Sequence, residues 1–355
     1  MRVLGIESSC DETAAALVED GHHVLGEAIA SQVAIHAQWG GIVPEIASRA
    51  HVENVLPVID QTLAQAGLTV EDVDAVAVTR GPGLVGALLV GVQVGKAFAY
   101  ARGLPLIGVN HLEGHLAAVY LDLPDGTFAQ PPKFPHLALL VSGGHSEILV
   151  VEDHGRCRTL GATRDDAAGE AYDKVGKQLG MAYPAGAQID GLAATGNPAA
   201  IAFPRAMRRE RYDLSFSGLK TAVAQHLAVN RRPEGQALAD LCASFQAALI
   251  DQVSEKIERA LVEEHLTELV LAGGVAANRG LRGALKIVCD RRGARFIVPP
   301  PSRCTDNAAM IACAGYFRLQ RGERAGLDLN AVASLPLDEL RVLRDKGPGA
   351  GRARA

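Results

Sequence analysis

Apolar and polar positions follow two alternating periods along the chain. Short apolar runs typical of strands are VLGI, AVAV, PLIGV, LALLV, EILVV, ELVLAGG and ARFIV. Longer stretches with helical spacing lie between them, such as HVENVLPVIDQTLAQAG and ASFQAALIDQVSEKIERALVEE. Because strands that alternate with helices are typical of layered α/β folds, we expect an α/β protein.

The longest apolar stretch is VGALLVGVQVG, from Val85 to Gly95. It contains Gln93 and stops at Lys96, well short of the ~20 residues that a membrane span needs. We expect a buried, glycine-containing helix there and no membrane association. The start, MRVLGIESSC, lacks the apolar core of a signal peptide and is expected to form a core strand.

Two segments resemble each other weakly. VLGIESSCDETAAALVED at Val3 and LALLVSGGHSEILVVED at Leu137 both predict strand, small polar turn, strand and an acidic residue. Turns rich in Ser and Gly leave backbone N–H groups free for phosphate, so two facing hairpins would form a nucleotide cleft. Taken alone, each loop is explained equally well as an ordinary tight hairpin.

Length and composition favour two closely packed domains, since the chain has 355 residues of which 48% are hydrophobic and 21% charged. The proline-rich segment QPPKFP at 130–135 is a natural boundary. We expect a first α/β domain at 1–133, completed by a C-terminal helix within 307–335, and a second at 134–306. Residues 336–355 lack apolar periodicity and are expected to be a disordered tail.

The net charge of −5 gives no global sign of nucleic-acid binding. Any RNA contact must therefore use local patches, for which the candidates are Arg205–Arg211 and Arg291–Arg295. We favour the first, although charge runs are usually solvated faces. The six cysteines lie far apart without a C-x-x-C pair, which favours a reducing compartment and a cytoplasmic location.

The sharpest local signal is HLEGH, in which His111 and His115 would share one face of a helix that follows the strand PLIGV. Two imidazoles so spaced can chelate one metal, although two surface histidines would give the same pattern. Zinc proteases of the H-E-x-x-H type need Glu directly after the first His. Leu112 stands at that position and Glu113 follows, so this protease class is excluded.

A third candidate ligand lies in CTDNAAMIACAGY, where Asp306 stands at the predicted start of a helix. As a lone feature it is best explained as an N-cap. Together with His111 and His115 it would complete a two-histidine, one-carboxylate site suited to iron or zinc. Upstream, LVLAGGVAANRGLR is a strand ending in Gly273 and Gly274, which would admit a base or ribose or serve strand–helix packing.

Taken together, the motifs resemble one family along nearly the whole chain. They are GIESSCDET, HAQWGGIVPEIASRAHVENV, RGPGLVGALLVG, NHLEGHLAA, LLVSGGHSEI, DDAAGEAYDK, SFSGLKTAV, AGGVAANRGLR and CTDNAAMIA, in that order. This set is similar to the bacterial TsaD group and its archaeal and eukaryotic relatives, the tRNA N6-adenosine threonylcarbamoyltransferases. The resemblance implies the actin-like ATPase fold, with two similar α/β domains around a nucleotide cleft.

The resemblance also implies the reaction and its site. The threonylcarbamoyl group of threonylcarbamoyl-AMP would pass to N6 of the adenosine 3′ of the anticodon, in tRNAs reading codons that begin with adenosine. One divalent metal, Fe²⁺ by family likeness or else Zn²⁺, would be held by His111, His115 and Asp306. The implied substrate-binding positions are Leu140, Val141, Ser142, Gly143 and Gly144 on the phosphate side, with Asp173, Gly186, Asp190 and Asn278 elsewhere around the nucleotide.

One departure from the family pattern is visible. The family usually shows a Pro-Gly-Gly-Pro turn where this chain has Pro184-Ala185-Gly186-Ala187. Gly186 is retained, but Ala185 would be strained if its position required a positive φ.

The reaction needs a proton acceptor, because the exocyclic amine of adenosine is a weak nucleophile. Asp11 and Glu12, in the turn of the first predicted hairpin, are the candidate catalytic residues. They would serve equally well to order the loop and water bound to the metal.

The resemblance further implies partners. These are the tRNA anticodon loop, a synthase that makes the adenylate, a dimerising TsaB-like paralogue and a small TsaE-like ATPase. The helical face of HVENVLPVIDQTLAQAG is a candidate docking surface, with burial in the protein's own core as the alternative. We expect the chain to be inactive or nearly so by itself. Competing functions are a non-catalytic scaffold and a kinase- or chaperone-type ATPase.

Overall fold

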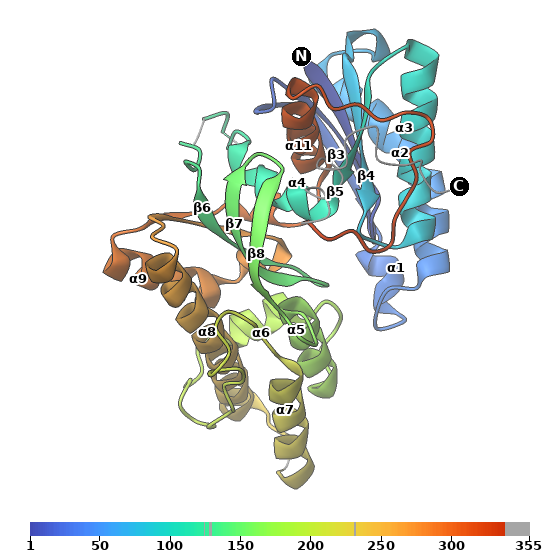
Figure 1. Cartoon of the computed structure of the whole chain (residues 1–355). Helices are drawn as coiled ribbons and strands as arrows, with labels where there is room; N and C mark the ends of the chain where they lie inside the picture. Colours follow the sequence, from blue (N-terminus) through green and yellow to red (C-terminus); the bar gives the residue numbers. More distant parts are fainter. Residues whose placement is uncertain (124, 128–129, 231, 338–355) are drawn as a thin grey trace, which may run out of the picture.

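The computed structural model describes residues 1–123, 125–127, 130–230 and 232–337, which form two halves, each built on a five-stranded sheet (Figure 1). The first sheet has the order β3-β2-β1-β4-β5. Its strands are β1 (Arg2–Glu7), β2 (Glu12–Glu19), β3 (His23–Ser31), β4 (Ala75–Gly81) and β5 (Leu106–Asn110). β1, β2 and β3 are antiparallel neighbours, whereas β4 and β5 run parallel to β1.

The second sheet repeats this topology. Its strands are β6 (His136–Val141), β7 (Ser146–Asp153), β8 (Arg156–Ala162), β9 (Glu268–Ala272) and β10 (Arg295–Ile297). β6, β7 and β8 are antiparallel, and β9 and β10 run parallel to β6. The weak sequence repeat therefore reflects two sheets of the same topology, each opening on a hairpin. The edge strands β3 and β8 are additions to the strands predicted from the sequence.

Helices cover the outer faces of both sheets. On the first sheet these are α2 (Pro44–Ala66) and α3 (Val85–Arg102), with the short α1 (Val33–Ala37) beside them. The second sheet is covered by α5 (Ala168–Gln178), α6 (Gly186–Ala193), α7 (Ser217–Val229), α8 (Gly235–Glu263) and α9 (Arg279–Arg292). Alternate residues of each strand point to opposite faces, so Leu4 packs toward α2 while Val3 packs toward the molecular centre.

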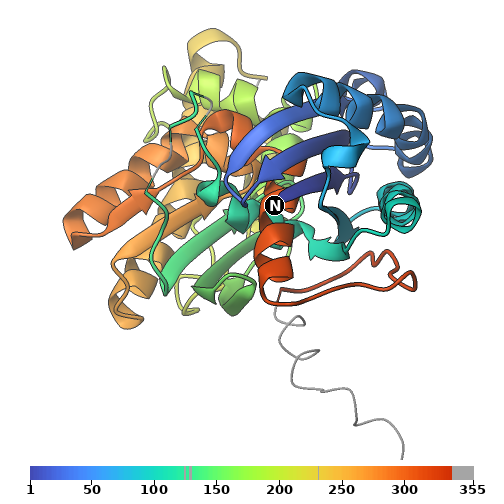
Figure 2. The same cartoon turned by 90° about the horizontal axis from the view of Figure 1, so that it is seen from above.

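A shared core joins the two halves. It contains residues of both sheets together with α4 (His111–Ala117) and α11 (Ala308–Gln320). α11 packs on β1, β2 and β4 of the first sheet, and α4 also contacts β6 and β9 of the second. Figure 2 shows α11 at the junction of the blue and the green halves. The position of α4 between the sheets places its side chains at the cleft.

The glycine-containing stretch expected as a buried helix is α3. A Cβ on Gly95 would lie 2.2 Å from Cγ1 of Val78 in β4, so glycine lets the helix approach the sheet closely. Val85 and Tyr100 remain exposed on its outer side. Of the helices in the described ranges, none is both long and apolar enough to cross a membrane.

Two expectations concerned the turn before α6 and the end of the chain. Ala185 has φ −95°, so the strain that a positive φ would cause is absent at this residue. Of the expected tail, residues 338–355 lie outside the described residues, but Leu337 is buried in the shared core. The ordered chain therefore continues to Leu337, beyond the expected boundary at 336.

A candidate active site between the two sheets

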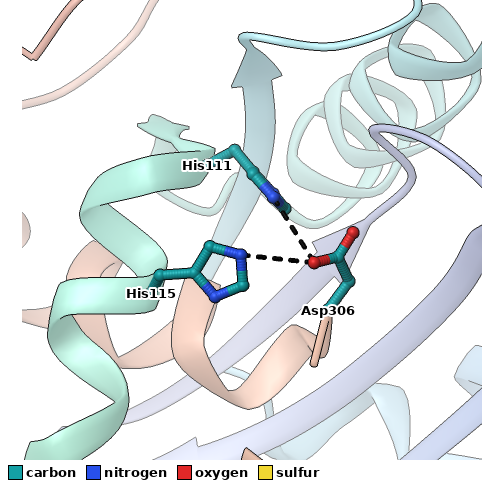
Figure 3. Close-up of side chains that lie close together, drawn as sticks. All are labelled: His111, His115 and Asp306. Carbon is teal, nitrogen blue, oxygen red and sulfur yellow. Dashed lines mark ion pairs between the residues drawn. The ribbon is translucent and has the colours of Figure 1, made fainter. Parts of the chain in front are cut away.

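A cluster of two histidines and one carboxylate lies at the carboxyl end of β5. Asn110 caps α4 by accepting a hydrogen bond of 2.8 Å from the N–H of Leu112, so the helix begins directly at His111. Nε2 of His111 lies 3.5 Å and Nε2 of His115 lies 3.2 Å from the same Oδ1 of Asp306 (Figure 3). The ligand atoms of the three residues all lie within 4.8 Å of one another.

The burial and charge of this cluster suit a cation. Both histidines are buried, and neither ring nitrogen of His115 has a hydrogen-bond partner among the described residues. Its contact with Asp306 is close but is not aligned as a hydrogen bond. Buried imidazole nitrogens without partners are costly, and a metal ion between the three side chains would satisfy them. The donor set of two imidazoles and one carboxylate fits iron or zinc.

The pKa values in the cluster reflect the same electrostatics. Burial would raise the pKa of Asp306, but the charges and close contacts of the two imidazoles outweigh it and hold that pKa far below its usual range. Burial would lower the pKa of His111, but Asp306 and Glu7 outweigh it and raise that pKa well above its usual value. The site thus stabilises positive charge strongly.

Glu7 supports His111 from behind and was not singled out in the sequence. Its carboxylate is fully buried, and Oε2 lies 3.1 Å from Nδ1 of His111. The same oxygen accepts a hydrogen bond of 2.6 Å from the hydroxyl of Thr79, and Oε1 accepts one of 2.5 Å from the N–H of Ser9. This leaves Nε2 of His111 directed at Asp306. The available signal was an acidic residue at the end of an otherwise apolar strand, GIESSC.

Asp306 is free for this role because its neighbour caps the helix. Oδ1 of Asn307 accepts a hydrogen bond of 2.9 Å from the N–H of Met310. The alternative interpretation of Asp306 as an N-cap is therefore wrong.

The cleft beside the cluster has two connected chambers. The inner chamber, of about 450 Å³, is lined by His111 and Asp306 of the metal cluster, by the Asp11–Glu12 turn and by the loop Ser142–Gly144. The outer chamber, of about 640 Å³, is lined by the loop after α1, by α5 and by the turn before α6. Residues lining both are Cys10, Ile42, Gly143, Gly144, Asp173 and Tyr183.

Both candidate catalytic carboxylates line the inner chamber. Oε1 of Glu12 accepts a hydrogen bond of 2.8 Å from the hydroxyl of Ser31. Its other oxygen is buried and has no hydrogen-bond partner among the described residues. Burial raises the pKa of Glu12 to about 7, and burial together with the charge of Asp306 raises the pKa of Asp11. Glu12 is thus equipped to take up a proton near neutral pH.

The loop of the second hairpin faces these acids across the inner chamber. Leu140 and Val141 are fully buried in β6, so only their backbone groups are available to a ligand. A Cβ on Gly143 or Gly144 would meet no atom within 4 Å. No hydrogen bond of the described residues uses their N–H groups. An open, glycine-lined turn of this kind is suited to phosphate.

The other predicted nucleotide positions divide into two groups. Asp173 lines both chambers, and its Oδ1 accepts a hydrogen bond of 2.8 Å from the N–H of Ala185. Gly186, Asp190 and Asn278 line neither chamber. Asp190 pairs with Arg279 at 2.9 Å, and Asn278 caps α9 through the N–H of Leu281 at 2.8 Å. The structure therefore does not bring these three to the inner chamber.

The glycine turn after β9 serves mainly packing. Gly273 has φ +91°, and a Cβ there would lie 2.4 Å from the carbonyl oxygen of Val141. Gly274 lines the inner chamber.

Acidic partners neutralise the second basic strip and part of the first, in which exposed Arg208 and Arg209 have no ion pair among the described residues. In the first strip, Arg205 pairs with Asp251 at 2.7 Å and Arg211 pairs with Glu263 at 2.6 Å. In the second, Arg291 and Arg292 both pair with Glu258, and Arg295 pairs with Glu268. Neither strip lines the two chambers. These contacts weaken both strips as RNA-binding candidates.

Comparisons with known proteins agree with this architecture. A profile of the family TsaD, tRNA N6-adenosine threonylcarbamoyltransferase, matches residues 23–313. A protein of that description from Anaeromyxobacter dehalogenans (strain 2CP-C) is 56% identical over 332 residues, 93% of this chain and 98% of the relative. Another from Sorangium cellulosum (strain So ce56) is 53% identical over 358 residues, 99% of this chain and 100% of the relative.

Solved structures with low sequence identity share the fold. HypF of T. kodakarensis aligns with a TM-score of 0.59 at 12% identity, covering 90% of this chain and 48% of HypF. Component A of the Acidaminococcus fermentans (R)-2-hydroxyglutaryl-CoA dehydratase aligns with a TM-score of 0.53 at 16% identity, covering 90% of this chain and 99% of that one. The expected actin-like ATPase fold is thereby confirmed. With a profile match and two relatives more than half identical over nearly their whole length, the chain belongs to the TsaD family of tRNA N6-adenosine threonylcarbamoyltransferases.

Proposed function

We propose that the inner chamber is where this chain carries out the family reaction, with a divalent metal held by His111, His115 and Asp306. The observation that carries the proposal is the arrangement of three features around one chamber, namely the metal cluster, the partnerless oxygen of Glu12 and the open Ser142–Gly144 loop. By family likeness the metal is Fe²⁺, and Zn²⁺ fits the same donors.

The chemistry assigns a task to each feature. N6 of the target adenosine forms a bond to the carbamoyl carbon of threonylcarbamoyl-AMP, the bond from that carbon to the phosphate oxygen breaks, and AMP leaves. The N–H groups of Gly143 and Gly144 hold the phosphate, while Oε2 of Glu12 accepts the proton that the amine loses. Bound metal supplies Lewis-acid polarisation of the donor's oxygens. In this scheme Asp11 stabilises the conformation of the turn and contributes negative charge to it.

The remaining nucleotide-binding positions are assigned by family likeness. Asp173 is suited to the ribose, because its Oδ2 remains available after Oδ1 binds the N–H of Ala185. Gly186, Asp190 and Asn278 would contact the nucleotide after a movement of α6 and α9 toward the cleft, in which the Asp190–Arg279 pair opens.

The protein is proposed to work in the cytoplasm with partner proteins. A separate synthase would supply the adenylate, because only one acyl-transfer site is assigned to this chain. α2 buries Val55, Ile59 and Leu63 but exposes 64% of Val52 and 60% of Leu56. This helix therefore has a core face and an apolar outer face, and the outer face is the proposed docking surface for a TsaB-like paralogue, with a TsaE-like ATPase as a further partner.

Nucleoside mass spectrometry of a reconstituted reaction tests this function. Purified chain, partner proteins, threonylcarbamoyl-AMP and unmodified tRNA should yield threonylcarbamoyladenosine and AMP in equal amounts. The same mixture without partners should give little or no product over multiple turnovers. ATP turnover in the absence of tRNA and insensitive to His115→Ala, with no modified nucleoside, would point instead to a kinase- or chaperone-type ATPase.

A further inference from the structure

One aromatic side chain lies where the two chambers meet. Tyr183 lines both chambers, and among the described residues no other Phe, Tyr or Trp lines either of them. Within the described ranges its hydroxyl makes no hydrogen bond and its ring contacts no other ring. Burial and the nearby charge of Asp11 raise its pKa, so the phenol is neutral. The ring is therefore available to a flat ligand.

A second aromatic residue lies in a loop that lines part of the outer chamber. Ala37, Gly40 and Gly41 line this chamber, and the loop that carries them also carries Trp39, which is 59% exposed. It is the only tryptophan of the sequence. Tyr183 comes from the opposite half of the molecule, just before α6, whereas Trp39 follows α1 (Figure 1). The two halves thus each carry one aromatic residue in a segment that lines the outer chamber.

The charges of the two chambers differ. The inner chamber is lined by the acids Asp11, Glu12, Asp173 and Asp306, so apart from the one phosphate assigned to the Gly143–Gly144 turn it disfavours the phosphates of an RNA backbone. The outer chamber is lined by two lysines, Lys174 and Lys177, and by two acids, Glu170 and Asp173. Lys174 is paired with Asp166 and Glu170 at 2.7 Å each, whereas Lys177 is exposed and has no acidic partner in the described part of the chain. A neutral base can therefore pass inward while its phosphate stays outside.

We propose that the outer chamber is the entrance for a base splayed out of the tRNA anticodon loop, with Tyr183 as its stacking platform. Trp39 stacks on a neighbouring base at the rim, and Lys177 contacts the adjoining phosphate. Single-stranded RNA is commonly bound in this way, by aromatic stacking on unpaired bases and cations on the backbone. This inference rests on the proposed function and adds to it the residues that bring the target adenosine to the metal cluster.

Steady-state kinetics in the reconstituted system, varying tRNA and threonylcarbamoyl-AMP separately, test the role of Tyr183. Tyr183→Ala should raise the KM for tRNA about tenfold, the size expected for one lost stacking contact. Tyr183→Phe, which keeps the ring, should match the wild type. Tyr100→Ala, on the exposed side of α3, is the control for tyrosine removal.

Three results would overturn the inference while leaving the function intact. One is an effect of Tyr183→Ala on the KM for the adenylate alone, which would assign the ring to the donor. Another is an equal rise of the KM for tRNA in Tyr183→Phe and Tyr183→Ala, which would assign the role to the hydroxyl. The third is an unchanged KM for tRNA in a normally folded Tyr183→Ala protein. Absence of any modified nucleoside with the wild-type chain would instead contradict the proposed function.

Trp39 and Lys177 allow a direct binding test with the full chain. Titration with an unmodified anticodon stem-loop at low salt should quench the fluorescence of the single tryptophan. Lys177→Ala should reduce the salt dependence of this binding by about one counterion, whereas Lys286→Ala, on α9, should not. Unquenched fluorescence at saturating RNA would remove Trp39 from the entrance, and an unchanged salt slope would remove Lys177.

Discussion

The two hairpins β1–β2 and β6–β7 occupy equivalent places in sheets of the same topology, yet their turns differ in chemistry. The first turn carries Asp11 and Glu12 and follows Glu7, so it presents carboxylates. The second carries Gly143 and Gly144 and presents unpaired backbone N–H groups. A duplicated scaffold thus supplies an acidic wall and a phosphate-binding wall to one cleft. The fold gives the two positions, and the loop residues give the function.

The turns also differ in what holds them: the second is closed by the Ser142 N–H, which donates a hydrogen bond of 2.8 Å to the carbonyl of His145, and is joined to α5 by the N–H of Gly169, which donates one of 3.2 Å to the carbonyl of Ser142. The hydroxyl of Ser8 donates a hydrogen bond of 3.0 Å to the carbonyl of Ala87 and accepts one of 3.2 Å from the N–H of Gly91. Nε2 of His51 lies 3.0 Å from the carbonyl of Cys10. The first turn is therefore anchored to α2 and α3, as suits residues that must hold a fixed geometry. The glycines of the second turn have open space beside them.

Replacing Glu12 should have the largest effect on turnover. Glu12→Gln removes the proposed proton acceptor, which typically costs about 100-fold in kcat. Because the pKa of Glu12 is raised to about 7, wild-type kcat should rise with pH through this value. The kcat of Glu12→Gln should not show this rise with pH. Exposed Glu234 offers the matched control, Glu234→Gln. An unaltered pH profile in Glu12→Gln would exclude it as the acceptor.

The same pKa predicts a stability change of known sign. Its folded value of about 7 exceeds the ordinary 4.5, so the folded protein binds the proton more tightly than the unfolded chain. The resulting stabilisation is present below pH 4.5 and is lost as pH rises through about 7. Glu12→Gln should therefore melt higher than the wild type at pH 8, and at pH 4 the two should melt alike.

Replacing Glu7 should weaken the metal site without touching a ligand. Glu7→Gln keeps the shape but removes the charge that orients His111, and losses of this kind lower metal affinity by about 10–100-fold. Chelator competition measures this directly. Thr79→Val, which removes only one hydrogen bond to Glu7, should give a smaller loss. Wild-type affinity in a folded Glu7→Gln protein would contradict the supporting role.

A methyl group in the second turn should affect ligand binding alone. Gly144→Ala meets no protein atom within 4 Å, so thermal stability should be unchanged. Because the methyl group intrudes where the phosphate is proposed to bind, affinity for the adenylate should fall by about tenfold, or 1.4 kcal/mol. The exposed Gly283→Ala in α9 also has open space and should leave the affinity unchanged, while it raises thermal stability slightly because alanine favours a helix over glycine by about 0.5–1 kcal/mol. Equal affinity in the Gly144 variant would place the phosphate elsewhere.

The smallest effect concerns the end of the chain. Truncation after Leu337 should leave the melting temperature unchanged, because the residues it removes belong to the tail expected to be disordered. Truncation after Ser334 also removes buried Leu335 and Leu337. With Leu335 goes the carbonyl that accepts a hydrogen bond of 2.8 Å from the side chain of Asn110. Loss of two buried leucines costs about 3 kcal/mol or more, so this protein should melt several degrees lower. Equal melting of both truncations would show that Leu337 contributes nothing.

The sequence predicted what depends on local pattern. Apolar runs marked the central strands, and i,i+4 spacing placed His111 and His115 on one helix face. Edge strands β3 and β8 were missed because most of their residues are only partly buried and several are polar, so neither forms an apolar run. The support by Glu7 joins residues 104 positions apart, which no local pattern contains. The N-cap choice between Asp306 and Asn307 also depended on backbone geometry, since both residue types cap helices.

Elemental analysis of the purified protein tests the central claim most directly. The account predicts one divalent metal per wild-type chain and loss of that metal in His111→Ala, His115→Ala and Asp306→Ala, with loss of modified nucleoside in the reconstituted reaction. His226→Ala, on α7 in the second half, should keep both the metal and the activity. Full metal occupancy in all three cluster variants would contradict the account.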